Sequence, residues 1–469
     1  MYKFFFLVLI CLAGFHHASV AQANRFISYN EPRYLITNVE LIDGTGAPVQ
    51  QNVNVLIDDG RIAALGINMS LPDGEEVPVI DGSGKTLIPG LVMLHEHIFY
   101  TKTFEGGFNV VNMTNTFPRM YLAGGVTTMR TAGSVSPHTD LNIQRRIRTG
   151  AQVGPKMDVT GPFIERAGLD IPQLPILPDS VSAGETTAYW AEMGCTSFKV
   201  YNYLTQDDLG EVVAEAHKAG YKVTGHLCSI SYREAAEIGI DNLEHGFTQA
   251  SDFIPGRKPN ECDPFRRSQS LSQLAYDSPE MKDLMEFLIE HGVAVTTTPA
   301  VFAPVKGYEA VLGGGEAALN PEILGKVQER YIRSLDYDSI LRARYQQELH
   351  FIKQFYDMGG NLVVGTDPTG SGRTLAGYAN LWTLESLAEA GFTLEEIVML
   401  CTSRGAKYLE RYELVGSIEP DKAADLVLID GLLSEGIENI RRVETVFKDG
   451  VGYDSELIFK SVAGKVGLY

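Results

Sequence analysis

Cysteine is scarce in this sequence, and the few cysteines form no recognisable set. The 469 residues contain five, of which Cys11 lies in the N-terminal segment and the others are Cys195, Cys228, Cys262 and Cys401. Their spacing is wide and includes no paired motif, so it indicates neither a disulfide scaffold nor a thiolate zinc site. A single bridge between Cys228 and Cys262 stays open as an option.

Positive charge is also in short supply. The chain has 39 Lys and Arg side chains against 59 Asp and Glu side chains, which gives a formal net charge of −20. Such a field repels polyanions, so nucleic acid and anionic membrane surfaces are poor partners, and we expect a small-molecule substrate instead. The 44% hydrophobic content is that of a globular protein with a large core, and no internal repeat or low-complexity tract interrupts it.

A long apolar run occurs at the N-terminus, over residues 4–15, and it is shorter than the roughly 20 residues that cross a bilayer. One lysine precedes this run and an Ala-Gln-Ala exit follows it, which is typical of a secretory signal peptide over residues 1–23. Ile10 stands before Cys11, where a lipoprotein signal has a small residue. We therefore expect a soluble exported protein, periplasmic or extracellular.

Both ends of the mature chain are rich in short β-type runs. Residues 34–64 carry Gly-Thr-Gly and Asp-Asp-Gly turns, and residues 424–430 and 443–453 repeat the pattern near the C-terminus. These runs predict antiparallel hairpins. The predicted organisation is a small β-sandwich domain built from residues 24–87 and 413–469, with a larger domain, residues 88–412, inserted between them.

The middle of the chain alternates between strand-like and helical segments. Its clearest helix follows Thr205 as the cap and stops at Gly220. The strand-like runs are residues 87–99, 125–131, 155–161, 196–201, 222–227, 242–246, 293–299 and 361–367. Eight strands in βα alternation predict an α/β fold, a (β/α)8 TIM-type barrel, with an open doubly wound sheet as the alternative.

Two histidines stand one residue apart at the end of the first of these strands, in LIPGLVMLHEHIF. Successive side chains of a strand point to opposite faces, so His95 and His97 share one face and Glu96 points the other way. Two neighbouring imidazoles form half of a metal site, although two ordinary strand-end histidines would look the same.

Catalytic groups of a parallel barrel collect at the carboxyl ends of its strands. These ends carry His95, His97, Lys199, His226, His245 and Asp367, whereas the other histidines of the mature chain, His138, His217, His291 and His350, fall in loops or helices. Imidazoles and one carboxylate suit a hydrolytic divalent metal such as zinc. The Lys199 ammonium would be repelled there, but as a carbamate (N6-carboxylysine) it becomes an anion that can bridge two metals.

The motifs IPGLVMLHEH, FKVY, VTGHL, NLEHG, VVGTDP and GSIEPDKAADLVLID resemble those of the amidohydrolase superfamily, in particular its imidazolonepropionase-like and Xaa-Pro dipeptidase-like group. The resemblance covers roughly residues 33–455 and implies the barrel, the β-sandwich and a two-metal site. It implies that His95, His97 and Asp367 hold one Zn²⁺ or another divalent metal, that His226 and His245 hold a second, and that carboxylated Lys199 bridges them. Met93 departs from the pattern, because the family usually has Asp there, and so does Thr131.

The expected reaction is attack of a metal-bridged hydroxide on a carbonyl, with Asp367 as the catalytic base that returns the proton to the leaving nitrogen. The resemblance gives Tyr201 a role in stabilising the oxyanion and contacting the substrate, against a plain pocket-wall role. Arg130 is a candidate clamp for a substrate carboxylate, with a structural ion pair as the alternative.

The favoured function is an exported binuclear metal-dependent hydrolase of amide or peptide-like C–N bonds in dipeptides or N-acyl amino acids. A mononuclear deaminase or cyclic-imide hydrolase and a non-catalytic binding barrel are the alternatives, and self-association stays open. The polar stretch 248–279 is expected to be an irregular lid over the site. Its basic residues, either contacts for a substrate carboxylate or simply solvated, are Arg257, Lys258, Arg266 and Arg267.

Overall fold

The structure is a computed structural model, and it describes residues 25–67, 69–71, 76–104, 107–169, 171–304, 312–369 and 372–468. The predicted signal peptide, residues 1–23, lies outside the described residues. Within the described ranges, no helix combines the length and the apolar composition that a bilayer crossing requires.

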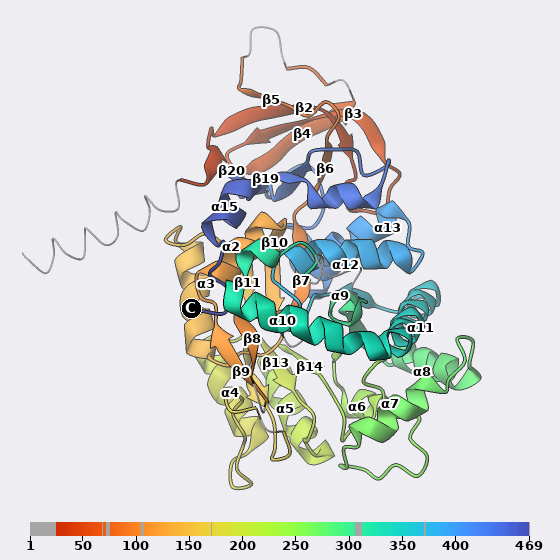
Figure 1. Cartoon of the computed structure of the whole chain (residues 1–469). Coiled ribbons are helices and arrows are strands. Elements are labelled where there is room, and N and C mark those ends of the chain that lie inside the picture. Colours follow the sequence, from red (N-terminus) through yellow and green to blue (C-terminus); the bar gives the residue numbers. More distant parts are fainter. Residues whose placement is uncertain are drawn as a thin grey trace, which may run out of the picture.

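Parallel strands follow one another in chain order through the middle of the molecule (Figure 1). They are β7 (Leu91–Glu96), β10 (Val126–Thr131), β11 (Lys156–Asp158), β12 (Thr160–Ile164), β13 (Ser197–Val200), β14 (Lys222–Gly225), β15 (Asn242–Glu244), β16 (Ala294–Thr297) and β17 (Leu362–Val364). The short β11 and β12 are two halves of one strand, interrupted at Val159: β11 pairs with β10, and β12 pairs with β13. Most side chains of these strands are buried, because both faces of the sheet are covered.

The two hydrogen-bonded groups of strands meet at both seams. Ser134, just beyond β10, bridges to Pro162 in β12. At the other seam the backbone N–H of Asp367, beyond β17, donates to the carbonyl oxygen of His95 in β7 at 2.8 Å. The predicted α/β class is confirmed, and the second of these contacts joins the first and last of the parallel strands.

Helices alternate with the strands. They are α2 (Thr116–Ala123), α3 (Pro137–Arg148), α4 (Ala183–Met193), α5 (Gln206–Lys218), α6 (Tyr232–Ile238), α7 (Pro264–Ser272), α8 (Pro279–Glu290), α9 (Pro299–Phe302), α10 (Pro321–Ser334), α11 (Asp338–Asp357), α12 (Tyr378–Glu389), α13 (Leu394–Met399), α14 (Gly405–Tyr408) and α15 (Ser455–Ser461). Short irregular turns are η2 (Glu316–Ala318), η3 (Leu335–Tyr337), η5 (Leu400–Arg404) and η6 (Ile437–Arg441), and β8 (Phe99–Phe104) pairs with β9 (Gly107–Asn112) as a hairpin. The predicted cap Thr205 forms a capping box with Asp208 and starts α5.

Strands from both ends of the chain form one nine-stranded sheet, seen above the barrel strands in Figure 1 as red and blue ribbons. They are β1 (Ile27–Tyr29), β2 (Arg33–Leu41), β3 (Gln50–Asp58), β4 (Arg61–Ile67), β5 (Val79–Asp81), β6 (Thr86–Pro89), β18 (Leu426–Ile429), β19 (Val443–Lys448) and β20 (Val451–Asp454). The hairpins predicted at each end are present, and β6 joins the two ends by antiparallel pairing with β18.

This sheet curls back over its own core. Tyr34 in β2 and Phe447 in β19 are three strand steps apart in the sheet, about 14 Å if it were flat. Their rings nevertheless stack with centroids 5.8 Å apart, and the Tyr34 hydroxyl donates to the carbonyl of Gly450 at 2.8 Å. The side chains between them form a core separate from that of the barrel.

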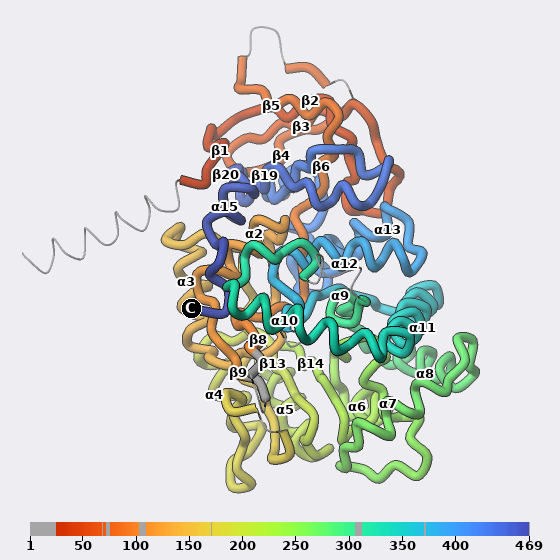
Figure 2. The backbone as a smooth tube through the Cα atoms, viewed as in Figure 1, coloured from red at the N-terminus to blue at the C-terminus, as the bar shows by residue number. Residues whose placement is uncertain are grey.

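The C-terminal tail leaves this sheet and returns to the larger domain (Figures 1 and 2). In α15 the Ser455 hydroxyl donates to the carbonyl of Ala123 in α2 at 2.7 Å. Farther along, Val466 bridges to Leu319 and packs in the main core. Within the segment 413–469 predicted for the β-domain, residues 455–468 therefore pack on the larger core.

Candidate metal centre

Six side chains from five strands meet at the carboxyl ends of the barrel strands. They are His95 at the end of β7 and His97 just after it, Lys199 in β13, His226 after β14, His245 after β15 and Asp367 after β17. Carboxyl ends of neighbouring parallel strands meet at one edge, so short local motifs far apart in sequence come together here.

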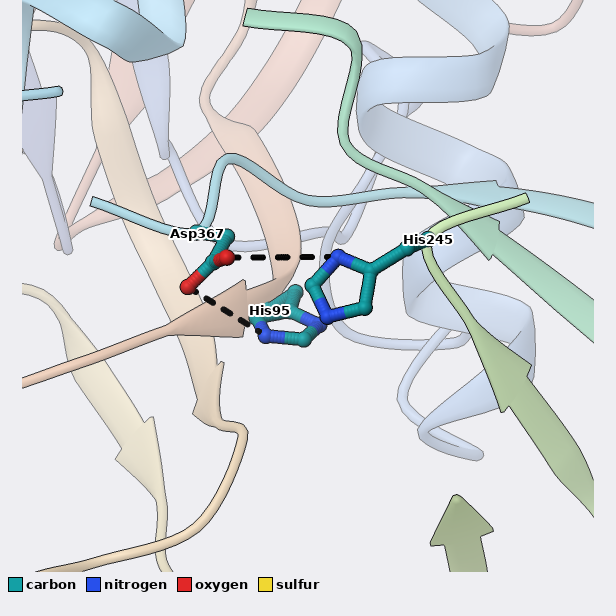
Figure 3. Close-up of side chains that lie close together, drawn as sticks. All are labelled: His95, His245 and Asp367. Atoms are coloured by element: carbon teal, nitrogen blue, oxygen red, sulfur yellow. Dashed lines mark ion pairs between the residues drawn. The ribbon is translucent and has the colours of Figure 1, made fainter. Parts of the chain in front are cut away.

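Asp367 lies among three imidazoles. Its Oδ1 is 3.1 Å from Nε2 of His97 and 3.6 Å from Nε2 of His95, and its Oδ2 is 3.9 Å from Nδ1 of His245. One ligand atom each from His95, His245 and Asp367 fits within 4.8 Å of the others, and Figure 3 shows these side chains pointing toward one another. This arrangement offers a divalent cation nitrogen and oxygen ligands at short range.

His226 extends the cluster beyond His245. Its ring centroid lies 4.6 Å from that of His245, which in turn lies 4.6 Å from that of His95. The Tyr201 ring packs against His226 at 4.7 Å. The imidazoles of His95, His245 and His226 therefore form a continuous row.

Burial keeps the imidazoles of His95, His226 and His245 neutral. It lowers the pKa of His95 to about 4 and that of His245 to about 3, and it lowers the pKa of His226 well below the usual value. Burial alone would raise the pKa of Asp367, but the hydrogen bond from His97 holds it well below the usual range. Neutral imidazoles beside an ionised carboxylate are ready to coordinate a metal.

Lys199 stands in this cluster with no hydrogen-bond partner among the described residues. Its side chain is only 1% exposed, and its Nζ lies 3.7 Å from Oε1 of Glu244. Burial lowers its pKa to about 8. A buried amine without a hydrogen bond is unusual, because buried polar groups are almost always satisfied, so this atom has room for a further hydrogen-bonding or covalent partner.

Glu244 holds the base of the cluster, a role that the sequence analysis missed. This fully buried carboxylate accepts a hydrogen bond from Nδ1 of His95 at 2.6 Å and one from Nη2 of Arg130 at 2.7 Å. The contact fixes the proton of His95 on Nδ1 and leaves Nε2 free on the side of Asp367. Met93, where the family usually has Asp, is buried in the core, so β15 supplies the carboxylate that orients His95. The sequence signal that could have revealed this role is Glu244 itself, a charged residue in the strand-like run that precedes His245.

Arg130 is held in place beside Glu244 by contacts within the protein. Its Nε donates to the carbonyl of Leu94 at 2.7 Å, its Nη2 binds Glu244, and its guanidinium lies over the ring of Tyr408 at 5.6 Å. The side chain is 1% exposed. This placement favours the structural ion pair over the contact to a substrate carboxylate.

Tyr201 forms part of the wall beside His226. Its ring also contacts Phe163 at 5.2 Å, and Phe99 stacks on His97 at 4.5 Å on the same side of the cluster. Burial raises the pKa of Tyr201 above the ordinary value, so its hydroxyl keeps its proton and can donate a hydrogen bond.

The backbone is strained at two of the predicted ligands. His245 and Asp367 adopt the left-handed region, with φ values of 67° and 50°. Side chains with a Cβ rarely occupy this region, and it clusters at functional sites. Gly365 allows β17 to come close to β7, because a Cβ there would lie 2.2 Å from that of His95.

A cavity of about 440 Å³ lies behind His245, and none of the six cluster side chains is in its lining. Phe302, in its wall, contacts the ring of His245 at a centroid distance of 6.0 Å, and the hydroxyl of Thr248, also in the wall, donates to the carbonyl of His245 at 2.8 Å. Part of the wall comes from the stretch 248–279. The expectation of an irregular lid was wrong in one respect, because Asp263 caps the helix α7 within it.

A disulfide between Cys228 and Cys262 ties this stretch to the loop after β14, as the sequence left open. Cys195 and Cys401 are buried and unpaired.

The sequence profile of the amidohydrolase family matches residues 86–452. The chain belongs to the amidohydrolase family. The family predicted from the strand-end motifs is therefore confirmed.

Relatives within the family are distant. The chain is 25% identical to an enamidase from Eubacterium barkeri over 212 residues, which cover 42% of this chain and half of the enamidase. It is 21% identical over 403 residues to an imidazolonepropionase from Geobacillus sp. strain WCH70, covering 81% of this chain and 84% of that protein. A crystal structure of a Xaa-Pro dipeptidase with bound methionine in the active site superposes with a TM-score of 0.65 at 20% identity, covering 90% of this chain and all of that one. This last likeness shows the fold.

Proposed function

We propose that this protein is an exported, binuclear metal-dependent amidohydrolase that cleaves amide or peptide-like C–N bonds of small substrates, dipeptides or N-acyl amino acids. Membership of the amidohydrolase family supports a hydrolase of C–N bonds. The fold likeness to a Xaa-Pro dipeptidase favours peptide-like substrates. The observation that carries the proposal is the buried amine of Lys199, which has no hydrogen-bond partner among the described residues and lies 3.7 Å from Glu244, beside neutral imidazoles and the carboxylate Asp367.

The residues present fit two divalent cations, with Zn²⁺ as the proposed metal. His95, His97 and Asp367 would hold one ion, and His226 and His245 the other. Lys199 would join them as N6-carboxylysine, because its Nζ is buried and unsatisfied and burial lowers its pKa toward the range where a free amine is available. His95, His245 and Asp367 come from both proposed ligand sets, and one ligand atom from each lies within 4.8 Å of the others, which supports ions at neighbouring positions.

When bound, the metal ions would activate a water molecule and polarise the carbonyl of the scissile bond. Asp367 would accept the proton of that water and return it to the leaving nitrogen, since its carboxylate faces the cluster in the ionised form. Tyr201, with its proton retained, would donate a hydrogen bond to the oxygen that gains negative charge. Glu244 would hold His95 in the coordinating tautomer.

We further propose that the parallel strands close as a (β/α)8 barrel and that the curled sheet forms the predicted β-sandwich. Export through the signal peptide 1–23 accords with the Cys228–Cys262 disulfide, because such bonds persist in oxidising compartments.

The test is a screen of exported, zinc-loaded protein against dipeptide and N-acyl amino acid libraries, with metal content measured on the same samples. We expect two metal ions per chain and hydrolysis in at least one library. Asp367→Asn is the matched control, and it should lower kcat by about 10²- to 10⁴-fold. Failure in both libraries with success on lactones or phosphoesters would overturn the proposal. One metal ion per chain, unchanged in Lys199→Ala, would favour the mononuclear alternative.

A further inference from the structure

Four basic residues in the stretch 248–279 were candidates for binding a substrate carboxylate, and the structure separates them. Arg257 pairs with Glu234 and donates to the carbonyl of Ser229. Lys258 pairs with Glu261 at 3.3 Å. Arg266 is exposed and donates to the carbonyl of Pro255. These three side chains are engaged within the stretch or beside it.

Arg267 differs from the other three. It lines the cavity beside the metal centre, donates through Nη1 to the carbonyl of Leu227 at 3.2 Å, and has no carboxylate within ion-pairing distance among the described residues. Its Nε is buried without a hydrogen-bond partner. Leaving a buried donor of a charged group unsatisfied costs free energy, and a bound anion would remove that cost.

The charge of Arg267 reaches the proposed catalytic groups. It acts electrostatically on Tyr201 and on His226, and burial lowers its own pKa. The disulfide at Cys262 anchors the chain shortly before α7, the helix that carries Arg267. The contact of Nη1 with the carbonyl of Leu227, the residue after His226, holds this guanidinium close to the row of imidazoles.

The cavity as a whole carries positive charge in an otherwise acidic protein. The charged residues in its lining are Arg267, Arg330, Arg344, Arg373, Asp338 and Glu348. Burial raises the pKa of Glu348 well above the ordinary value, and Asp338 pairs with Arg342. A second unsatisfied atom, Oε1 of Gln249, lies in the same lining and is an acceptor for an N–H group.

We propose that Arg267 binds the free carboxylate of the substrate and makes the enzyme selective for dipeptides and N-acyl amino acids over their carboxyl-terminal amides. Gln249 would accept the N–H of the same substrate. The inference rests on the proposed function for the reaction, but the binding step can be measured without it.

The experiment compares N-acetyl-L-phenylalanine with N-acetyl-L-phenylalaninamide by calorimetric titration of metal-free protein. We expect the acid to bind at least about tenfold more tightly, since a hydrogen bond to a charged group contributes about 1.5 to 3 kcal/mol. Arg267→Gln should abolish this preference, Arg267→Lys should retain part of it, and the neighbouring Arg266→Gln should leave it intact.

Equal binding of acid and amide by the unmodified protein, or equal losses in Arg267→Gln and Arg266→Gln, would overturn the inference. A parallel assay compares turnover of a hydrolysed dipeptide with that of its carboxyl-terminal amide. An acid preference without turnover of any amide bond would refute the proposed function and retain Arg267 as an anion site. Turnover of an amide bond without an acid preference would support the proposed function and refute the role of Arg267.

Discussion

Replacing Glu244 with glutamine should weaken metal binding by about 10- to 100-fold, the range found when outer partners of a ligand are lost. The carboxylate makes buried contacts of 2.6 Å to His95 and 2.7 Å to Arg130. The glutamine side chain can still accept from Arg130, but an amide N–H directed at Nδ1 of His95 favours a proton on Nε2, the nitrogen that should coordinate. The expected loss corresponds to about 1.4 to 2.8 kcal/mol of binding free energy.

The larger change Glu244→Ala should also destabilise the metal-free protein. It leaves Arg130 buried without its carboxylate, and breaking a buried ion pair costs about 3 to 5 kcal/mol. The assay is competition for Zn²⁺ against a chelator of known affinity, with urea unfolding of the metal-free protein alongside. Glu40→Gln is the control, because Glu40 is equally buried but binds Thr86 and Ser434 in the β-domain. Unchanged zinc affinity in a folded Glu244→Gln protein would refute the reasoning.

Three further predictions concern other parts of the molecule. Lys199→Ala should leave one metal ion per chain instead of two by elemental analysis, and two retained ions would contradict the bridging role. Replacing both Cys228 and Cys262 with serine opens a loop with a sequence separation of 34, which should cost about 4 kcal/mol of local stability. Hydrogen exchange should then become faster in α7 and not in α5. Equal changes in exchange rate in the two helices would contradict this prediction. Burial raises the pKa of Asp140 to about 7, so the folded state binds this proton more tightly than the unfolded chain. The free energy of unfolding should therefore fall as the pH rises from about 4 to about 7, by roughly 1.4 kcal/mol for each pH unit in this range. Asp140→Asn should flatten this slope in urea titrations.

The positions of the proposed ligands could be predicted from the sequence because they depend on local order. An apolar run that ends in His, Lys or Asp marks the carboxyl end of a buried strand, and parallel strands bring such ends together whatever lies between them. His95 and Asp367 are therefore neighbours although they follow the first and the last of the barrel strands, as the backbone hydrogen bond between them shows.

The partners of these residues could not be predicted in the same way. Glu244 reaches His95 from another strand, 149 positions away, and a charged residue before His245 does not by itself identify His95 as its partner. Arg266 and Arg267 are adjacent in sequence, yet one is exposed and the other lines the cavity, because the helix α7 turns them to different sides. The break of the third strand at Val159 also follows from pairing with two different neighbours.

The β-domain has a consequence for how the chain reaches its native state. Leu87 in β6 pairs with Leu428 in β18, so the β6 edge of the N-terminal strands has no partner until nearly the whole polypeptide exists. Contacts between residues so far apart in sequence form slowly. Until they form, the unpaired strand edge can pair with other chains. Pairing of the last strands therefore completes the β-domain. A chain that ends before β18 leaves an open strand edge on its N-terminal hairpins, and such an edge promotes aggregation.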